Sequence, residues 1–268
     1  MAGRFDRIYQ ITSNRQIAPE THLMRLAAPE LARHAVPGQF AMIRAGEDES
    51  LDPLLRRPLS IHQADSSGGT VDFLYRVVGR GTRLLSEKAP GDHVAVLGPL
   101  GRGFSVRHEA IPVLVGGGLG VAPLLFLAKS LQGRLGVICL GAITKSQLLR
   151  LSAFTDTGLE ILAATEDGSF GTRGLVTEAL DRMLAGLEAE DRQRIQILAC
   201  GPVPMLRAVV RLAGHYRCPC QVSLEAFMAC GSGLCLGCAV PDASGQGYLH
   251  VCREGPVFDA SRIDWERI

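Results

Sequence analysis

The pattern of hydrophobic and polar positions changes near residue 111. Before that point, short apolar runs are separated by turn signals such as Pro37-Gly38 and Pro90-Gly91, and residues 71–77 largely alternate between apolar and polar side chains. A period of two is typical of a half-buried strand. Regularly spaced short strands without a long helical pattern predict a small antiparallel β-barrel, which we assign to residues 1–104.

Beyond residue 111, buried-strand runs alternate with helical stretches. The expected strands cover residues 111–115, 135–140, 158–164 and 195–199, and the expected helices cover residues 124–131, 144–151, 176–187 and 203–214. This alternation predicts a parallel sheet covered by helices, in an α/β domain of residues 105–222. The predicted fold class is therefore α/β plus β, completed by a cysteine-rich subdomain of residues 223–268.

Two turns follow expected strands of the α/β domain. One is a glycine-rich turn between a strand and a helix, and the other is a Cys-Gly-Pro turn. Ligands bind at the carboxyl ends of parallel strands, and a helix N-terminus favours a pyrophosphate. The turns therefore predict a dinucleotide site. Its candidate residues are Gly117, Gly118, Gly120, Cys200, Gly201 and Pro202.

Two segments of the barrel suit a phosphate-containing ligand. An arginine can bind a phosphate through two N–H groups, and the proline after it fixes the backbone beside a flat ligand. A glycine before a threonine lets backbone amides approach a diphosphate. Each segment alone could also be an edge-strand device or an ordinary helix cap. The candidate residues are Arg57, Pro58, Leu59, Ser60, Leu74, Tyr75, Arg76, Gly81 and Thr82.

Four cysteines in the last forty residues have the spacing of a metal site. Cys230, Cys235, Cys238 and Cys252 follow the C-x4-C-x2-C…C pattern, which is the spacing of plant-type [2Fe-2S] ferredoxins. The glycines between the first three permit the tight turns that such a loop needs. A structural zinc site is the alternative, although zinc sites usually pair two C-x2-C units and only one is present. Disulfides are disfavoured because nothing marks the chain as secreted.

The remaining four cysteines carry weaker signals. Cys139 and Cys200 lie in apolar runs and are expected to be buried strand residues. Cys218 and Cys220 flank a proline, and we interpret them as two incidental thiols. A place beside a nicotinamide is expected for Cys200, but a role as proton donor or nucleophile is not.

Composition narrows the classes of partner. The chain has 268 residues and a net charge of +1, so no basic surface indicates nucleic acid. The N-terminal residues lack the apolar core of a signal peptide. The longest apolar runs are of strand length and too short to span a membrane. We expect a cytoplasmic protein that binds neither nucleic acid nor membrane.

Together, the barrel segments resemble the flavin-binding half of the ferredoxin–NADP reductase family. The resemblance implies that Arg57 binds the FAD diphosphate, that Pro58 and Leu59 lie along the flavin, and that Ser60 lies near flavin N5. It also implies that Leu74, Tyr75 and Arg76 line the ribityl and adenosine side, with Gly81 and Thr82 at the phosphates. Leu59 departs from the many members that have an aromatic residue there.

The α/β domain resembles the nucleotide-binding half of the same family. Residues 117–123 are similar to its nicotinamide diphosphate loop, residues 200–202 to its C-G-P turn beside the nicotinamide, and residues 166–171 to a D-G-S-x-G loop. The implied exchangeable substrate is NAD. The choice between NAD and NADP stays open, since Lys145 and Arg150 suit either a 2′-phosphate or a solvated surface.

The cysteine-rich region resembles the electron transfer subunit of class 1B dihydroorotate dehydrogenase, through residues 223–231, 235–238 and 251–258. The resemblance covers essentially the whole chain. It implies an FMN-containing catalytic partner that oxidises dihydroorotate in pyrimidine biosynthesis, in a heterotetramer of two plus two subunits. Electrons would pass from FMN through one [2Fe-2S] cluster and one FAD per subunit to NAD+, with no dihydroorotate site on this chain. Ala226 and Phe227 depart from the more polar residues of many relatives, which is expected to change the partner surface or the surroundings of the cluster.

Two alternatives remain at this point. The same three modules serve NAD(P)H-dependent ferredoxin reductases, sulfhydrogenases and sulfite reductases, so the identity of the partner decides between them. A non-enzymatic zinc-binding adaptor is the alternative from another class. A flavin and iron protein is yellow-brown and bleaches on reduction, whereas a zinc adaptor is colourless.

Overall fold

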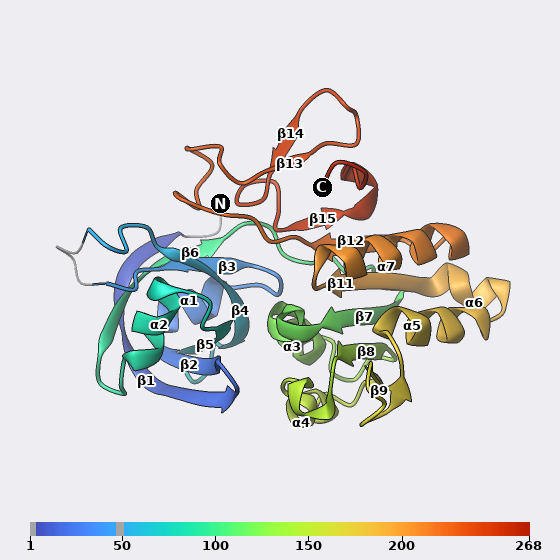
Figure 1. Ribbon diagram of the computed structural model, residues 1–268, viewed down its shortest axis with the longest axis horizontal. Coiled ribbons are helices and arrows are strands. Elements are labelled where there is room, and N and C mark those ends of the chain that lie inside the picture. The colour runs from blue at the N-terminus through green and yellow to red at the C-terminus, as the bar shows by residue number, and fades with distance from the viewer. Residues whose placement is uncertain (1–3, 47–50) are drawn as a thin grey trace.

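The computed structural model describes residues 4–46 and 51–268. Its N-terminal part is a closed antiparallel barrel with the strand order β1-β2-β5-β4-β3-β6, as predicted (Figure 1). The strands are β1 (Phe5–Ala18), β2 (Thr21–Ala27), β3 (Phe40–Ile43), β4 (Arg57–Asp65), β5 (Thr70–Arg76) and β6 (His93–Leu100), with the helices α1 (Pro29–His34) and α2 (Arg80–Glu87).

The second part is a seven-stranded sheet with the order β10-β9-β8-β7-β11-β12-β15. All of its pairings are parallel except that of β15 with β12. The strands are β7 (Ile111–Gly117), β8 (Val137–Ala142), β9 (Glu160–Thr165), β10 (Thr172–Arg173), β11 (Ile195–Cys200), β12 (Cys220–Ser223) and β15 (Val257–Asp259). The helices are η1 (Gly118–Val121), α3 (Ala122–Ser130), η2 (Lys145–Gln147), α4 (Leu151–Thr155), α5 (Val176–Ala185), α6 (Ala189–Arg194) and α7 (Val203–Tyr216).

Side chains of alternate residues on β7 pack on opposite faces of this sheet. Val113 and Val115 join the core formed with α5 and α7, whereas Leu114 joins the core formed with α3 and α4. Successive strand residues point to opposite faces, so a strand that is covered on both faces must be apolar throughout. This arrangement explains why residues 111–115 form an uninterrupted apolar run.

One predicted helix is wrong. Residues 144–151 do not form a single helix, because the short turn η2 ends at Gln147 and α4 begins only at Leu151. Arg150 between them has a left-handed backbone conformation, with φ of 62°. A right-handed helix cannot continue through such a residue. Helix α6 was not predicted, because its residues are almost all charged or polar and show no apolar period.

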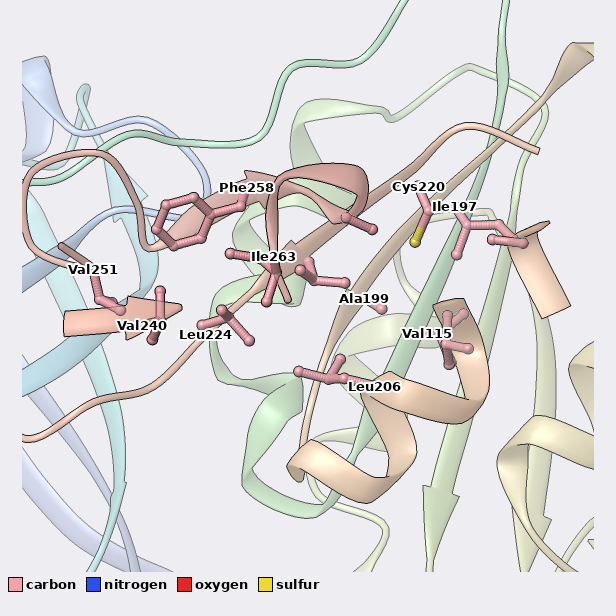
Figure 2. Close-up of a cluster of buried hydrophobic side chains, with 14 of the residues drawn as sticks. Val115, Ile197, Ala199, Leu206, Cys220, Leu224, Val240, Val251, Phe258 and Ile263 are labelled. Atoms are coloured by element: carbon pink, nitrogen blue, oxygen red, sulfur yellow. The ribbon is translucent and has the colours of Figure 1, made fainter. Parts of the chain in front are cut away.

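The C-terminal region lies across the top of both parts in Figure 1. It contains the small hairpin of β13 (Ala239–Pro241) and β14 (Tyr248–His250), then β15, then η3 (Ala260–Arg262). Figure 2 shows Phe258 beside Val251 and Val240 of this region, and all three belong to one buried cluster with Leu206 and Ala199 of the sheet domain. The region therefore shares its core with the sheet domain.

The structure also bears on membrane insertion. Within the described ranges, no helix combines the length and the hydrophobicity needed to cross a membrane.

Candidate functional site

Strand β4 separates the barrel core from a surface that faces the rest of the molecule. Leu59 and Ile61 belong to the barrel core. Alternation along the strand therefore places Pro58, Ser60 and His62 on the outer face. Ser60 and Pro58 are half-buried there. The side chain of Leu59 is directed into the barrel, so only its backbone remains for a ligand on the outer face.

Arg57 and Gly81, two of the expected FAD residues, lie in contact. A Cβ atom at Gly81 would lie 2.3 Å from Nε of Arg57, so glycine lets the N-terminus of α2 approach this guanidinium without displacing it. Arg57 also donates a hydrogen bond to the carbonyl of Leu55. A guanidinium beside a helix N-terminus combines two groups that attract phosphate.

Thr82 closes the turn before α2. Its Oγ1 accepts hydrogen bonds from the backbone N–H groups of Val78 at 2.9 Å and Gly79 at 3.2 Å. The hydroxyl thus fixes the backbone of the turn. Thr82 itself is buried.

The three expected residues at the end of β5 have different surroundings. Tyr75 is buried in the barrel core, and its hydroxyl donates to Oδ1 of Asn14 at 3.1 Å. Leu74 is buried on the other side, among residues of α3 and its neighbours. Arg76 is exposed and lines a pocket on the sheet domain. Of the three side chains, Arg76 alone is placed to reach a bound ligand.

The two predicted dinucleotide turns meet at the carboxyl ends of β7 and β11. These strands are adjacent and parallel, with Cys200 opposite Gly116. A Cβ atom at Gly120 would lie 2.3 Å from the carbonyl oxygen of Cys200 and 2.5 Å from Cα of Gly201. The backbones of the two turns therefore touch, and Gly120 is the residue that permits it.

A pocket of about 450 Å³ opens beside these turns. Gly117, Gly118 and Pro202 form part of its wall, and Arg76 reaches it from the barrel. The pocket also has lining residues that were not singled out from the sequence, among them Ile143, Gln147, Thr177 and Met205. Glu166 also lines the pocket, and it is the first residue of the segment 166–171 that resembles a D-G-S-x-G loop. The pocket is large enough for part of a dinucleotide.

Cys200 lies at this site as a neutral thiol. It is buried, and burial raises the pKa of its thiol to about 12. A thiol with that pKa remains protonated near neutral pH, which agrees with the expectation that Cys200 is not a nucleophile.

The D-G-S loop is ordered by its own side chains. Oδ1 of Asp167 accepts hydrogen bonds from the N–H of Ser169 at 2.9 Å and from its hydroxyl at 2.6 Å. The backbone N–H of Lys145 donates to Oγ of Ser169 at 2.8 Å, and the Lys145 ammonium lies 5.4 Å from the ring centre of Phe170. Lys145 is thus positioned against this loop.

The cysteine loop contains no helix or strand between residues 224 and 238. The backbone N–H groups of Ser232 and Cys235 each lie 3.4 Å from Sγ of Cys230, and the N–H of Cys252 lies 3.4 Å from Sγ of Cys238. Gly231 and Gly233 have φ of 66° and 86°, which makes these turns possible. Such N–H groups stabilise sulfur that carries negative charge.

The pKa values of Cys230 and Cys252 are shifted in opposite directions. Burial would raise the pKa of Cys230, but the N–H groups of Cys235 and Ser232 lower it to about 5. Burial and the neighbouring Cys238 raise the pKa of Cys252 to about 12. Among the residues that the structure describes, no three or more His, Cys, Asp or Glu side chains are already arranged to hold a metal ion. The four sulfur donors and the N–H groups directed at Cys230 and Cys238 nevertheless fit an iron–sulfur cluster.

The cysteine loop packs directly on the barrel. A Cβ atom at Gly231 would lie 2.4 Å from Cγ of Met42, a residue of β3. Met42 lies opposite Pro58 in the pairing of β3 with β4. The cysteine loop therefore contacts Met42 on β3, and β3 is the neighbour of β4, the strand expected to hold the flavin.

The other four cysteines are buried. Figure 2 shows Cys220 in the core beside Ile197. Burial raises the pKa of Cys220 and Cys139 to about 12 and also raises that of Cys218. Sγ of Cys218 lies 3.7 Å from the carbonyl oxygens of Arg192 and Tyr216. Their surroundings are those of packed neutral thiols.

A barrel with a phosphate-suited strand, a parallel sheet with a dinucleotide pocket, and a cysteine loop define a flavin and iron–sulfur oxidoreductase of the ferredoxin reductase class. The comparisons with known proteins support this class. Residues 9–104 match the oxidoreductase FAD-binding domain, and residues 225–264 match the iron-sulfur cluster binding domain of dihydroorotate dehydrogenase B.

Curated relatives extend the likeness over nearly the whole chain. The dihydroorotate dehydrogenase B (NAD(+)) electron transfer subunit of Desulforamulus reducens is 41% identical over 259 residues, which cover 93% of this chain and 95% of the relative. The subunit of Geobacillus thermodenitrificans is 41% identical over 263 residues, with 94% and 96% covered. The chain belongs to the family of dihydroorotate dehydrogenase B electron transfer subunits.

Solved structures agree with the fold. A structure described as an NADH-dependent reduced ferredoxin-NADP oxidoreductase superposes with a TM-score of 0.85 and 31% identity, covering 99% of this chain and 92% of the other. A ferredoxin reductase in carbazole 1,9a-dioxygenase superposes with a TM-score of 0.66 and 22% identity, covering 81% and 67%. The second likeness concerns the fold alone.

Proposed function

We propose that this chain transfers electrons between a dihydroorotate-oxidising catalytic subunit and NAD+, as part of pyrimidine biosynthesis in the cytoplasm. The proposed cofactors are one FAD and one [2Fe-2S] cluster, and the proposed assembly contains two copies of each subunit. When bound, a flavin exchanges a hydride with nicotinamide and single electrons with an iron–sulfur cluster. The contact of Gly231 with Met42 carries this proposal, because it joins the cysteine loop to the strand beside Pro58.

The protein residues have distinct parts in this function. Arg57, beside Gly81, would hold the FAD diphosphate, while Pro58 and Ser60 would orient the flavin on the outer face of β4. Gly117, Gly118 and Gly120 would bring backbone close to the nicotinamide dinucleotide. Gly201 and Pro202 would bound the nicotinamide end of the same pocket. Cys230, Cys235, Cys238 and Cys252 would hold the cluster.

The surface beside the cysteines supports a partner on this side. Phe227 is 97% exposed and Leu234 is 83% exposed, and Leu236 is exposed as well. Cys235 between them is also exposed. Large apolar side chains concentrated beside a metal-binding loop are typical of a protein interface. We propose that the catalytic partner covers these residues.

The experiment that tests this function uses the purified chain with and without a catalytic subunit from the same operon or genome. The chain alone should oxidise NADH with an artificial acceptor. It should not oxidise dihydroorotate, since we place the dihydroorotate site on the catalytic subunit. Adding the catalytic subunit should produce dihydroorotate-dependent reduction of NAD+. Dihydroorotate oxidation by the chain alone would contradict the proposal.

A second candidate is an NAD(P)H-dependent reductase subunit for ferredoxin. The 0.85 TM-score to the NADH-dependent reduced ferredoxin-NADP oxidoreductase favours it. Purifying the chain from its native cells and identifying the bound subunit by mass spectrometry distinguishes the two. Recovery of a dihydroorotate dehydrogenase supports the first function, and recovery of a larger flavoprotein reductase subunit supports the second.

A further inference from the structure

A buried histidine joins the barrel to the sheet domain. His62 lies on β4 and has no exposed surface. Its Nδ1 lies 2.7 Å from the carbonyl oxygen of Ala122, and its Nε2 lies 3.2 Å from Nε of Arg150. Ala122 is the first residue of α3 and directly follows the glycine-rich turn. Figure 1 shows α3 between the barrel and the sheet.

The two partners fix the protonation of the ring. A carbonyl oxygen can only accept, so Nδ1 of His62 carries the hydrogen. The Nε–H of Arg150 can only donate, so Nε2 is unprotonated. His62 is therefore the neutral Nδ1–H tautomer, and adding a proton at Nε2 would break the bond to Arg150.

The charged surroundings favour the same form. Burial lowers the pKa of His62 to about 4, the hydrogen bond to the Ala122 carbonyl opposes this, and Arg150 adds to the lowering. Lys129 of α3 also lowers the pKa, whereas Asp72 of β5 raises it. Arg15 and Arg25 lie near Arg150 as further cations, and Arg25 is paired with Asp72 at 2.7 Å.

Arg150 is held in a conformation that its residue type rarely adopts. Its φ of 62° interrupts the helical path between η2 and α4 and brings its side chain to His62. A left-handed arginine persists only where the surrounding structure determines it. Arg150 was a candidate for a 2′-phosphate in the sequence, but its Nε is engaged at the contact between the two domains.

We propose that His62 and Arg150 are positioning residues that fix the nucleotide turn against the flavin-carrying face of β4. The inference rests on the proposed function, since it takes Ser60 on the same face as a flavin neighbour and residues 117–120 as a nucleotide turn. His62 follows Ser60 by two residues, and Ala122 follows Gly120 by two residues. One hydrogen bond thus links the two binding elements and would help to hold them at a fixed separation when FAD and the nicotinamide are bound.

The test measures flavin reduction by NADH in the FAD-loaded chain by stopped flow. In His62→Ala the limiting rate should fall about 10- to 100-fold, because small displacements of reacting groups have effects of that size. The apparent dissociation constant of NADH should change by less than about threefold, because the residues that contact NADH are all kept and only the placement of the turn against β4 changes. His62→Asn, which can still donate to the Ala122 carbonyl, should recover part of the rate. Arg150→Asn should lower the rate too, because asparagine tolerates the left-handed backbone but lacks the guanidinium.

A matched control lies at the same contact. Nζ of Lys129 donates to Oε1 of Gln63 at 2.8 Å across the exposed rim of the two domains. Lys129→Met should change the limiting rate by less than about twofold, since exposed polar contacts contribute little. An equal loss of rate in Lys129→Met and His62→Ala would overturn the special role of the buried pair.

Two measurements test the pair without catalysis. NMR of protein with ¹⁵N-labelled histidine should show His62 as the neutral Nδ1–H tautomer at neutral and mildly acidic pH, with the signal identified by its loss in His62→Asn. Hydrogen–deuterium exchange should rise in residues 117–131 of His62→Ala. A protonated His62 at pH 6, or unchanged rates per bound FAD in both His62→Ala and Arg150→Asn, would overturn the inference. If wild-type FAD is not reduced by NADH, the proposed function fails, and these two measurements still decide whether the pair joins the domains.

Discussion

The nucleotide pocket and the cysteine loop both depend on glycine, but in different settings. At the pocket, Gly120 allows two turns to touch at the ends of adjacent strands in a continuous sheet. At the loop, Gly231 and Gly233 shape a segment that has no helix or strand of its own. The fold alone holds the first site together. The second has its four sulfur donors in one region, but they are not already arranged for a metal ion, so we expect its final geometry to come from the bound metal, as is common for metal sites.

This difference predicts that each site can be damaged without the other. The largest difference between the effects on the two sites is expected from Cys235→Ser, which removes an exposed sulfur donor from the loop. Iron content should fall to near zero and the EPR signal of the reduced protein should disappear or change. NADH reduction of FAD should largely persist, because the pocket lies on the sheet domain. Loss of both properties together would show that the two sites are not independent.

The converse change is Gly120→Ala. Its new Cβ would meet the backbone of Cys200 and Gly201, which cannot move as a flexible side chain would. We expect NADH affinity to weaken by about 100-fold, as displaced backbone turns lose several hydrogen bonds of ~1 kcal/mol each. Iron and FAD content should stay near wild type. Gly214→Ala is the control, since a Cβ there meets nothing within 4 Å; unchanged NADH binding in Gly120→Ala would contradict the close approach.

A smaller effect tests whether FAD depends on the barrel alone. Arg57→Ala should weaken FAD binding by about 10- to 100-fold, since a hydrogen bond to a charged group contributes ~1.5–3 kcal/mol. Flavin and iron are measured on the same preparation, and iron should be retained. Equal retention of flavin by wild type and variant would count against Arg57 as the diphosphate ligand.

The smallest effect is expected from Cys218→Ser combined with Cys220→Ser. Both thiols are buried and Cys220 lies opposite Ile197 in the sheet, so iron content, EPR signal and NADH reduction of FAD should match wild type. A modest fall in melting temperature is expected, because serine places a hydroxyl in an apolar core. Loss of the cluster in this double variant, with a normal cluster in Cys235→Ser, would overturn the assigned ligand set.

The sequence predicted what local periodicity and spacing determine. The barrel and the alternating sheet follow from periods of two and from buried apolar runs, and the meeting of the two turns follows from strand ends that must share one edge. The family resemblance, and not periodicity, placed Leu59, Leu74 and Tyr75 at the flavin, and their places at the ligand stay a prediction. Their side chains are buried in protein, which the local pattern did not indicate.

Contacts between segments that are distant in the sequence could not be predicted from the local pattern. The left-handed backbone at Arg150 is held by a partner on another domain, and nothing in its neighbours indicates it. The pairing of β15 with β12 joins segments that a cysteine loop separates in sequence. Such contacts depend on how the domains pack, and a single sequence contains no local signal for them.

The strand β15 also has a consequence for engineering. It covers the edge of the sheet that β12 would otherwise leave open. An uncovered edge offers unpaired N–H and C=O groups to other chains and promotes aggregation. Shortening the gene after β12, in order to obtain a flavin reductase without the cysteines, would expose this edge and the core that Val251 and Phe258 cover, so we expect it to favour aggregation. The cysteines can be changed one by one, but the segment that carries them cannot be cut away.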